Sequence, residues 1–245
     1  MAPVTELCRI FPKEGQEAEL EAVLADTSIT LLEQPGVEGV YTSATLEKDN
    51  PLHLLIVEWD SIDSHKAFES KTDIYKPFVQ KLLPVLASPP IVYHTSFSPE
   101  HPPVLHNAEG KGGAKSAVAE LLHLYFPTGD AFTADQMAAT AKNYREFLGH
   151  LPGNAAGHTG EAAGGWTVEE LEFKGEKVRA FVVAIGWDSL EAHLEYRKTE
   201  HFAKHIPLVR GLDGLKGVEV FHVMDAFKWE SEGRMTVIWM YEGLV

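Results

Sequence analysis

The chain has one cysteine, few basic residues and no long run of apolar residues. Cys8 excludes an intrachain disulfide, which fits a reducing compartment. The 21 Lys and Arg residues stand against 36 Asp and Glu, and the formal net charge of −15 disfavours binding to nucleic acids and to anionic membranes. No apolar stretch approaches the ~18 residues that a membrane span needs, and the N-terminus lacks the pattern of a signal peptide. We therefore expect a cytoplasmic protein without nucleic-acid or membrane partners.

The sequence also lacks the motifs that hold nucleotides or catalytic metals. It has no phosphate loop, no nucleophile elbow and no HExxH, and the glycines of 110–113 lie in a segment without the flanking strand and helix of a phosphate site. We expect no cofactor and no metal. The 44% hydrophobic and 23% charged residues are typical of a globular protein with enough chain for two modest cores.

What the sequence does contain is an internal repeat. The motif WDSIDSH at 59–65 recurs as WDSLEAH at 187–193, 128 residues later. Upstream, PGVEGVY at 35–41 matches PGNAAGH at 152–158 at an offset of 117, so the second copy carries an insertion of about eleven residues between the two motifs. An offset near half of the chain has the size of a small domain. The sequence therefore predicts two copies of one fold.

Each copy is predicted to contain a strand, an amphipathic helix, a hairpin, a helical stretch and a closing strand. This order is the ferredoxin-like plan, an α+β fold with an antiparallel sheet and helices on one face. In the first copy the strands are expected at 6–11, 37–46, 52–59 and 91–97, and helices at 16–34 and 72–86. A helix between 59 and 72 carries His65 and Phe68, and its N-cap is expected at Asp60, with Asp63, or at Ser61, with Ser64. In the second copy, strands are expected at 117–126, 166–173, 178–187 and 219–226. One helix is expected to begin at Thr133, where Thr133 and Gln136 form a capping box, and another is expected after 187, capped by Asp188 and Glu191.

Composition sets the domain boundaries. We expect a first unit at 1–98, a linker rich in proline and glycine at 99–116 and a second unit at 117–227. Residues 228–245 form an extension whose TVIWMY segment, 236–241, is β-prone and should pack along a sheet edge or against a partner. A homodimer formed through this extension is compatible with that pattern.

The repeated motifs carry a family resemblance. The PG turn after the first helix and the W-D-S-[IL]-[DE]-[SA]-H start of the next helix, with an aromatic residue three positions on, resemble the antibiotic-biosynthesis-monooxygenase-like branch of the dimeric α+β barrel superfamily. The resemblance covers both copies and implies that they pair through their open sheet faces as an intramolecular dimeric α+β barrel. The superfamily includes cofactor-free monooxygenases and polyketide cyclases of secondary metabolism, haem-degrading enzymes and proteins without known activity.

The second copy is the better candidate for an active half because it carries more histidines. Tyr196, His201 and His205 are predicted on one helix, with the two histidines four residues apart on one face. Imidazole and phenol together can take a proton from a phenolic or enolic substrate, and His201 is the favoured base. The helix resembles that of plant olivetolic-acid-type cyclases, in which a tyrosine and a histidine carry out this proton transfer. Tyr196 matches that tyrosine in spacing, and His201 falls one residue short.

Haem-degrading relatives place a haem ligand one residue from His205, so we expect haem not to be the native cofactor. Without a carboxylate or cysteine at ligand spacing, the histidine pair alone is a weak metal site. Further candidates for proton transfer are His123, His158 and His222. His65 and His193 recur in both copies, which favours a role in the fold.

We expect a small-molecule enzyme without an organic cofactor, an oxygenase or cyclase acting on an aromatic or polyketide-like substrate by His/Tyr acid–base chemistry. The alternatives are a non-catalytic protein of the same superfamily that binds a ligand or serves in assembly, and a haem-binding member. A screen of thermal stability against phenolic and polyketide ligands distinguishes the hypotheses, because a bound ligand raises the stability of the protein. No shift with any aromatic ligand or with haem would favour the non-catalytic protein.

Overall fold

The structure is a computed structural model that describes residues 2–47, 51–97, 116–224 and 227–229. Two units of the same plan follow one another along the chain. The first contains strand β1 (Val4–Ile10), helix α1 (Glu17–Leu32), strands β2 (Val37–Ala44) and β3 (His53–Trp59), helices α2 (Ile62–Ser70) and α3 (Thr72–Leu82), the short helix η1 (Leu83–Val85) and strand β4 (Ile91–Thr95).

The second unit repeats this order with an elaborated hairpin. It contains β5 (Val118–Phe126), η2 (Gly129–Ala131), α4 (Ala134–Gly149), β6 (His158–Trp166), β7 (Leu171–Phe173), β8 (Glu176–Trp187), α5 (Leu190–Tyr196), α6 (Glu200–His205), α7 (Pro207–Arg210) and β9 (Gly217–Met224). The expected insertion corresponds to β7 and to the extended β8, which has 12 residues where β3 has 7. The turn between β7 and β8 places Lys174 and Gly175 at positive φ, 54° and 78°.

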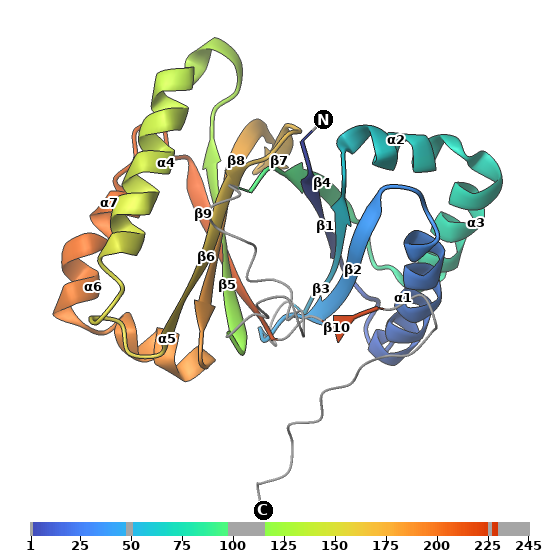
Figure 1. Cartoon of the computed structure of the whole chain (residues 1–245), viewed down its shortest axis with the longest axis horizontal. Coiled ribbons are helices and arrows are strands. Elements are labelled where there is room, and N and C mark those ends of the chain that lie inside the picture. The colour runs from blue at the N-terminus through green and yellow to red at the C-terminus, as the bar shows by residue number, and fades with distance from the viewer. Residues whose placement is uncertain (1, 48–50, 98–115, 225–226, 230–245) are drawn as a thin grey trace, which may run out of the picture.

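The two sheets face each other and the helices cover their outer faces (Figure 1). The strand order is β10-β2-β3-β1-β4 in the first sheet and β6-β8-β5-β9 in the second, where β10 is Phe227–Lys228 and β7 pairs with β8. Isolated bridges between Thr45 and Val223 and between Thr95 and Thr167 join the two sheets at both edges. The chain is therefore an α+β protein of two ferredoxin-like units that form an intramolecular barrel, as the sequence predicted.

Strand alternation divides the buried residues into a barrel interior and two outer cores. Along β5, the odd-numbered Leu121 and Tyr125 face the other sheet, and the even-numbered Leu122 and Leu124 face the helices of their own unit. The barrel interior is filled by apolar side chains from both units, which explains why β1 and β5 are buried along their whole length. Each sheet has a second core under its helices.

The structure corrects several local expectations. Ser189, rather than Asp188, is the N-cap of α5 and accepts a hydrogen bond from the backbone N–H of Ala192. Ser61 caps α2 in the same way, which was one of two predicted options, and the Thr133/Gln136 capping box is present. The strand expected at 166–173 is instead the end of β6 followed by β7, because the chain bends between Trp166 and Leu171.

The segment after β9 returns to the first unit. β10 pairs with β2, and the backbone N–H of Trp229 donates to the carbonyl of Val40. The expected linker at 99–116, apart from Ser116, and the β-prone segment 236–241 lie outside the described residues. Within the described part of the chain, none of the helices combines the length and the apolar character needed to cross a membrane.

Candidate functional site

A cavity of about 140 Å³ lies between the sheet and the helices of the second unit. Most of its wall is apolar, with Val183, Ile185 and Phe202 among the lining residues. The side chains with polar atoms that line it are Glu120, Tyr144, Trp187, His193, Tyr196, Arg197 and Arg210. A concave, mostly apolar space with a few converging polar groups is the usual form of a small-molecule site.

The elements around the cavity position its polar groups. Glu120 is an even-numbered residue of β5 and therefore faces the helices, although it stands in an otherwise apolar strand. Trp187 ends β8, and its indole N–H donates to the Glu120 carboxyl group over 3.2 Å. His193 lies one turn into α5 and stacks on Trp187 with ring centroids 4.9 Å apart. The repeated WDS-H motif thus brings an indole and an imidazole to one carboxyl group, while its serine caps the helix that carries the imidazole.

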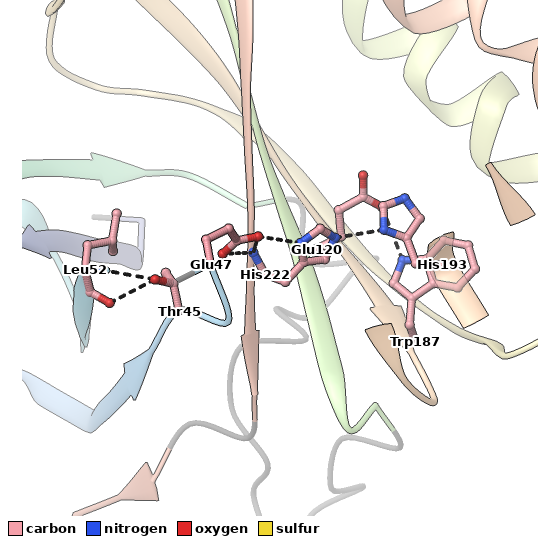
Figure 2. Close-up of polar contacts among 7 residues, drawn as sticks. All are labelled: Thr45, Glu47, Leu52, Glu120, Trp187, His193 and His222. Atoms are coloured by element: carbon pink, nitrogen blue, oxygen red, sulfur yellow. Dashed lines mark hydrogen bonds and ion pairs between the residues drawn. The ribbon is translucent and has the colours of Figure 1, made fainter. Parts of the chain in front are cut away.

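A chain of hydrogen bonds and ion-pair contacts runs from this carboxyl group to the first unit (Figure 2). Nε2 of His193 lies 3.3 Å from Glu120, and its Nδ1 lies 2.8 Å from Nε2 of His222 on β9. Nδ1 of His222 in turn lies 2.7 Å from the carboxylate of Glu47, a residue that follows β2 in the other unit. All members except Glu47 are buried.

One arrangement of protons satisfies every contact of this chain with both imidazoles neutral. The Glu47 carboxylate accepts, so Nδ1 of His222 carries a hydrogen and Nε2 of a neutral His222 accepts from His193. A neutral His193 then presents a lone pair to Glu120, and that contact requires one proton shared by Glu120 and His193. Burial raises the pKa of Glu120 to about 7 and lowers the pKa of His193 to about 3, so Glu120 holds the shared proton.

The first unit contains the corresponding residues in the same order, although Nε2 of His65 lies 3.6 Å from Glu6, farther than the 3.3 Å between His193 and Glu120. Trp59 donates to Glu6 over 2.7 Å, His65 and His94 are 2.8 Å apart, and the carboxylate of Glu169, from the second unit, lies 2.7 Å from Nδ1 of His94. Burial likewise raises the pKa of Glu6 to about 7 and lowers that of His65 to about 4. The two units therefore exchange one carboxylate each, and His65 and His193 occupy the same place in their units.

The two units differ in what else reaches the cavity. The equivalent space in the first unit, about 110 Å³, is lined by Phe68 where the second has Tyr196. Glu69 follows Phe68, whereas Arg197 follows Tyr196. Both cavities have a buried glutamate and a phenol, which Tyr75 supplies in the first. The second cavity differs in its two arginines, which favour an anionic ligand, whereas the first carries Glu69 as an additional carboxylate.

Tyr196 connects the cavity to a cluster of histidines on the outside of the unit. The structure ends α5 at Tyr196 and starts α6 after Thr199, which accepts a hydrogen bond from Phe202, so Tyr196 and His201 do not share one helix as expected. The Tyr196 hydroxyl nevertheless lies 3.1 Å from Nδ1 of His201. Desolvation, followed by the charges of neighbouring His205 and His150, lowers the pKa of His201.

The other expected site residues are spread over the molecule. His222 belongs to the buried chain and does not line the cavity, while His123 lies fully buried in the barrel interior, with Nε2 2.5 Å from the Tyr93 hydroxyl. His158 begins β6 with its ring 5.7 Å from that of Trp187. Among the six sequence candidates, all of which are described, Tyr196 is the one that lines the cavity.

Sequence reasoning missed Glu6 and Glu120, and it also missed the two carboxylates that cross between units. One signal was present: Glu-Leu recurs at 6–7 and 120–121, at matching places in two apolar strands. A repeated charge in a buried strand indicates a partner that the fold supplies. Arg197, Arg210 and His150 have no comparable signal, since they fall on positions where the two copies differ.

Comparison with solved structures confirms the resemblance at the level of the fold. An anthrone oxidase-like protein matches with a TM-score of 0.64 and 12% identity over 97% of this chain and 98% of its own. A candidate monooxygenase from Fusobacterium nucleatum matches with a TM-score of 0.59 and 9% identity, over 91% and 92%. One from Lactobacillus acidophilus gives 0.53 and 10%, over 94% and 100%.

No protein-family model matches the chain, and no curated protein matches its sequence significantly. The three structures cover both units of this chain and nearly all of their own lengths, so the tandem arrangement is common to them. At these identities the likeness concerns the fold.

Proposed function

We propose that the chain is a small-molecule enzyme that works by acid–base chemistry without an organic cofactor, as an oxygenase or a cyclase, in the cavity of the second unit. The observation that carries the proposal is the buried carboxyl group of Glu120, with a pKa of about 7, on the wall of a cavity that also presents Tyr196 and Arg197. A general base is most effective when its pKa lies near the working pH.

Cavity size limits the substrate. An engineered apolar cavity of about 150 Å³ holds one benzene molecule, and the volume here is about 140 Å³. The space therefore fits one aromatic ring, such as a phenol or a compact enol, and a polycyclic substrate requires the helices to move outward. Arg197 and Arg210 favour the ionised form of such a ligand.

In this proposal the ionised form of Glu120 removes a proton from the bound phenol or enol, and the indole N–H of Trp187 holds the carboxylate through its hydrogen bond. The Tyr196 hydroxyl donates a hydrogen bond to the oxygen on which negative charge develops. The resulting phenolate or enolate shares its negative charge with a ring or α carbon. That carbon can form a bond to dioxygen and give a peroxide, as in an oxygenase, or add to a carbonyl group of the same molecule and give an alkoxide that takes up the proton, as in a cyclase. Proton removal is the step that both reaction types share.

The test begins with a screen of phenols and enols by thermal stability, since a ligand at 100 times its Kd adds about 2.7 kcal/mol. Turnover of the binders is then followed by oxygen consumption and by mass spectrometry of the products. Glu120→Gln should lower turnover by about 10²–10⁴. Glu6→Gln makes the same change in the equivalent chain of the first unit and should leave turnover within about twofold.

Equal losses in both variants would contradict the assignment to the second cavity. His201→Ala tests the base that the sequence favoured. If this variant lost as much turnover as Glu120→Gln, His201, acting through Tyr196, would be the base. A ligand that stabilises the protein without turnover under any condition would favour the alternative of a non-catalytic binding protein.

A further inference from the structure

Three histidines of the second unit lie close together outside the cavity. His150 is the C-cap of α4, and His201 and His205 lie one turn apart on α6. One ring nitrogen of each lies within 4.8 Å of those of the other two. The rings of His150 and His205 are stacked with centroids 3.9 Å apart, and those of His201 and His205 are 4.3 Å apart. The pair seen in the sequence thus gains a third imidazole from another helix.

We propose that His150, His201 and His205 bind a divalent transition-metal ion, for which zinc is the representative. Three neutral imidazoles with a fourth, open position form a common zinc arrangement. In a tetrahedral site the ligand nitrogens lie roughly 3.3 Å apart, and rotation of the half-buried side chains closes the remaining distance. The site lies apart from the cavity of the proposed function, and the proposal does not depend on that function.

The hydrogen bonds of the cluster leave the right nitrogens free. Nδ1 of His205 donates to the backbone carbonyl of His201 over 2.8 Å, which leaves its Nε2 with a lone pair. Nδ1 of His201 faces the Tyr196 hydroxyl, so its Nε2 is also the free atom. A ligating histidine usually has its other ring nitrogen held by such a partner.

The internal repeat shows that the fold does not require these histidines. The C-cap of α1, which corresponds to His150, is Glu33. Counted from the matching KTD and KTE segments, His201 and His205 correspond to Ile74 and Phe78. Three positions that the first unit fills with a carboxylate and two apolar residues are all histidine in the second, and they meet in space. A packing role common to both units does not account for that.

The buried cluster of Glu6, His65 and His94 is a weaker candidate for a metal. Its two imidazoles are joined by a hydrogen bond of 2.8 Å, which is shorter than the separation of two ligands on one tetrahedral ion. Their remaining nitrogens face Glu6 and Glu169. That cluster already has its partners.

Metal binding would change the hydrogen bond at Tyr196. With an ion on Nε2, Nδ1 of His201 carries the hydrogen and donates to the Tyr196 oxygen. The phenolic hydrogen is then free to turn toward the cavity that Tyr196 lines. Occupancy of the outer site would in this way set the direction in which Tyr196 donates.

The test uses the full chain after treatment with a chelator. Titration calorimetry with Zn²⁺ and the visible absorption of bound Co²⁺ report affinity, stoichiometry and ligand type. We expect one equivalent to bind, and His150→Ala and His205→Ala each to weaken it about 100-fold or more, since loss of an outer partner alone commonly costs 10–100-fold. Tyr196→Phe should weaken it within that smaller range.

Glu33→Ala, the matched change at the C-cap of α1, should leave the affinity unchanged. Melting temperatures without metal show whether each variant is folded, and both histidines are only half-buried. No binding by the unsubstituted chain, or binding that survives either His150→Ala or His205→Ala with equal affinity, would overturn the proposal.

Discussion

Glu47 of the first unit holds His222 of the second at two points. Its carboxylate accepts a hydrogen bond from the backbone N–H of His222 over 3.0 Å and lies 2.7 Å from Nδ1 of the same residue. Glu169 of the second unit makes the same pair of contacts with His94, at 2.7 Å each. The barrel is thus closed by a reciprocal exchange of carboxylates as well as by apolar packing.

Removal of either carboxylate should destabilise the fold. Glu47→Ala leaves a buried imidazole and a backbone N–H of His222 without their acceptor, and we expect a loss of about 1–3 kcal/mol in the free energy of unfolding. Glu169→Ala should cost a similar amount. Urea denaturation measures both, with Glu170→Ala as the control, since the exposed ion pair of Glu170 with Lys177 should contribute less than about 0.5 kcal/mol. Values as small as the control would contradict the structural role.

The buried acid–imidazole pair makes a prediction about pH. Between about pH 4.5 and 6.5 the folded pair holds one proton, on Glu120, because the pKa of Glu120 is about 7 and that of His193 about 3. The unfolded chain also holds one, on His193, since ordinary pKa values are about 4.3 for glutamate and 6.5 for histidine. Because the folded and the unfolded pair bind the same number of protons, the pair does not make the free energy of unfolding depend on pH in this window.

Glu120→Gln should create a slope. The folded variant holds no proton at the pair, whereas unfolded His193 still binds one below about pH 6.5. Stability then rises with pH by about 1.4 kcal/mol per unit, relative to the unsubstituted protein, between about pH 4.5 and 6.5. Denaturation curves of both proteins across this range give the difference, and other titrating groups cancel. Parallel pH profiles would show that the pair does not hold one proton.

The internal repeat allowed the fold to be predicted from the sequence. Because the WDS-H motif and its flanks occur twice, one unit could be checked against the other, and the order of strands and helices followed from ordinary periodicity. The break between α5 and α6 was missed although Thr199 is a good N-cap residue, because the spacing of Tyr196, His201 and His205 alone was read as one helix.

The site was harder to predict because the residues that interact in it are far apart in the sequence. Glu47 lies 175 residues from His222, and their contact depends on how the two sheets meet. His150 joins His201 and His205 through helix packing, which the spacing of the histidines does not record. Glu120 was passed over because a charged residue in a strand is usually placed on the exposed side, whereas both faces of β5 are covered in this barrel.

His123 offers a test of whether a buried histidine packs or reacts. Its Nε2 shares a hydrogen bond of 2.5 Å with the Tyr93 hydroxyl, its Nδ1 has no partner within the described chain, and burial lowers its pKa to about 3. Tyr93→Phe should cost about 1–3 kcal/mol of unfolding free energy because it leaves Nε2 unpaired.

The double variant Tyr93→Phe/His123→Leu removes both partners and should be no less stable than Tyr93→Phe alone. Urea denaturation of the unsubstituted protein, the two single variants and the double variant measures this difference. Strictly additive losses would show that the two side chains do not interact. Such a result would make His123 available for the proton-transfer role that the sequence suggested.

Trp229 gives the last prediction, since it joins the end of the described chain to the first unit. Its indole N–H donates to the Thr42 hydroxyl over 3.0 Å, its ring packs in the core under α1, and 9% of the residue is exposed. Trp229→Ala should cost about 3–5 kcal/mol, the usual range for a buried tryptophan, and Trp229→Phe about 1 kcal/mol, mainly for the lost hydrogen bond. Leu83→Ala, at an apolar residue of the same unit that is 56% exposed, is the control and should change stability by less than about 0.5 kcal/mol. If Trp229→Ala matched this control in urea denaturation, the return of the chain to β2 would not contribute to the stability of the first unit.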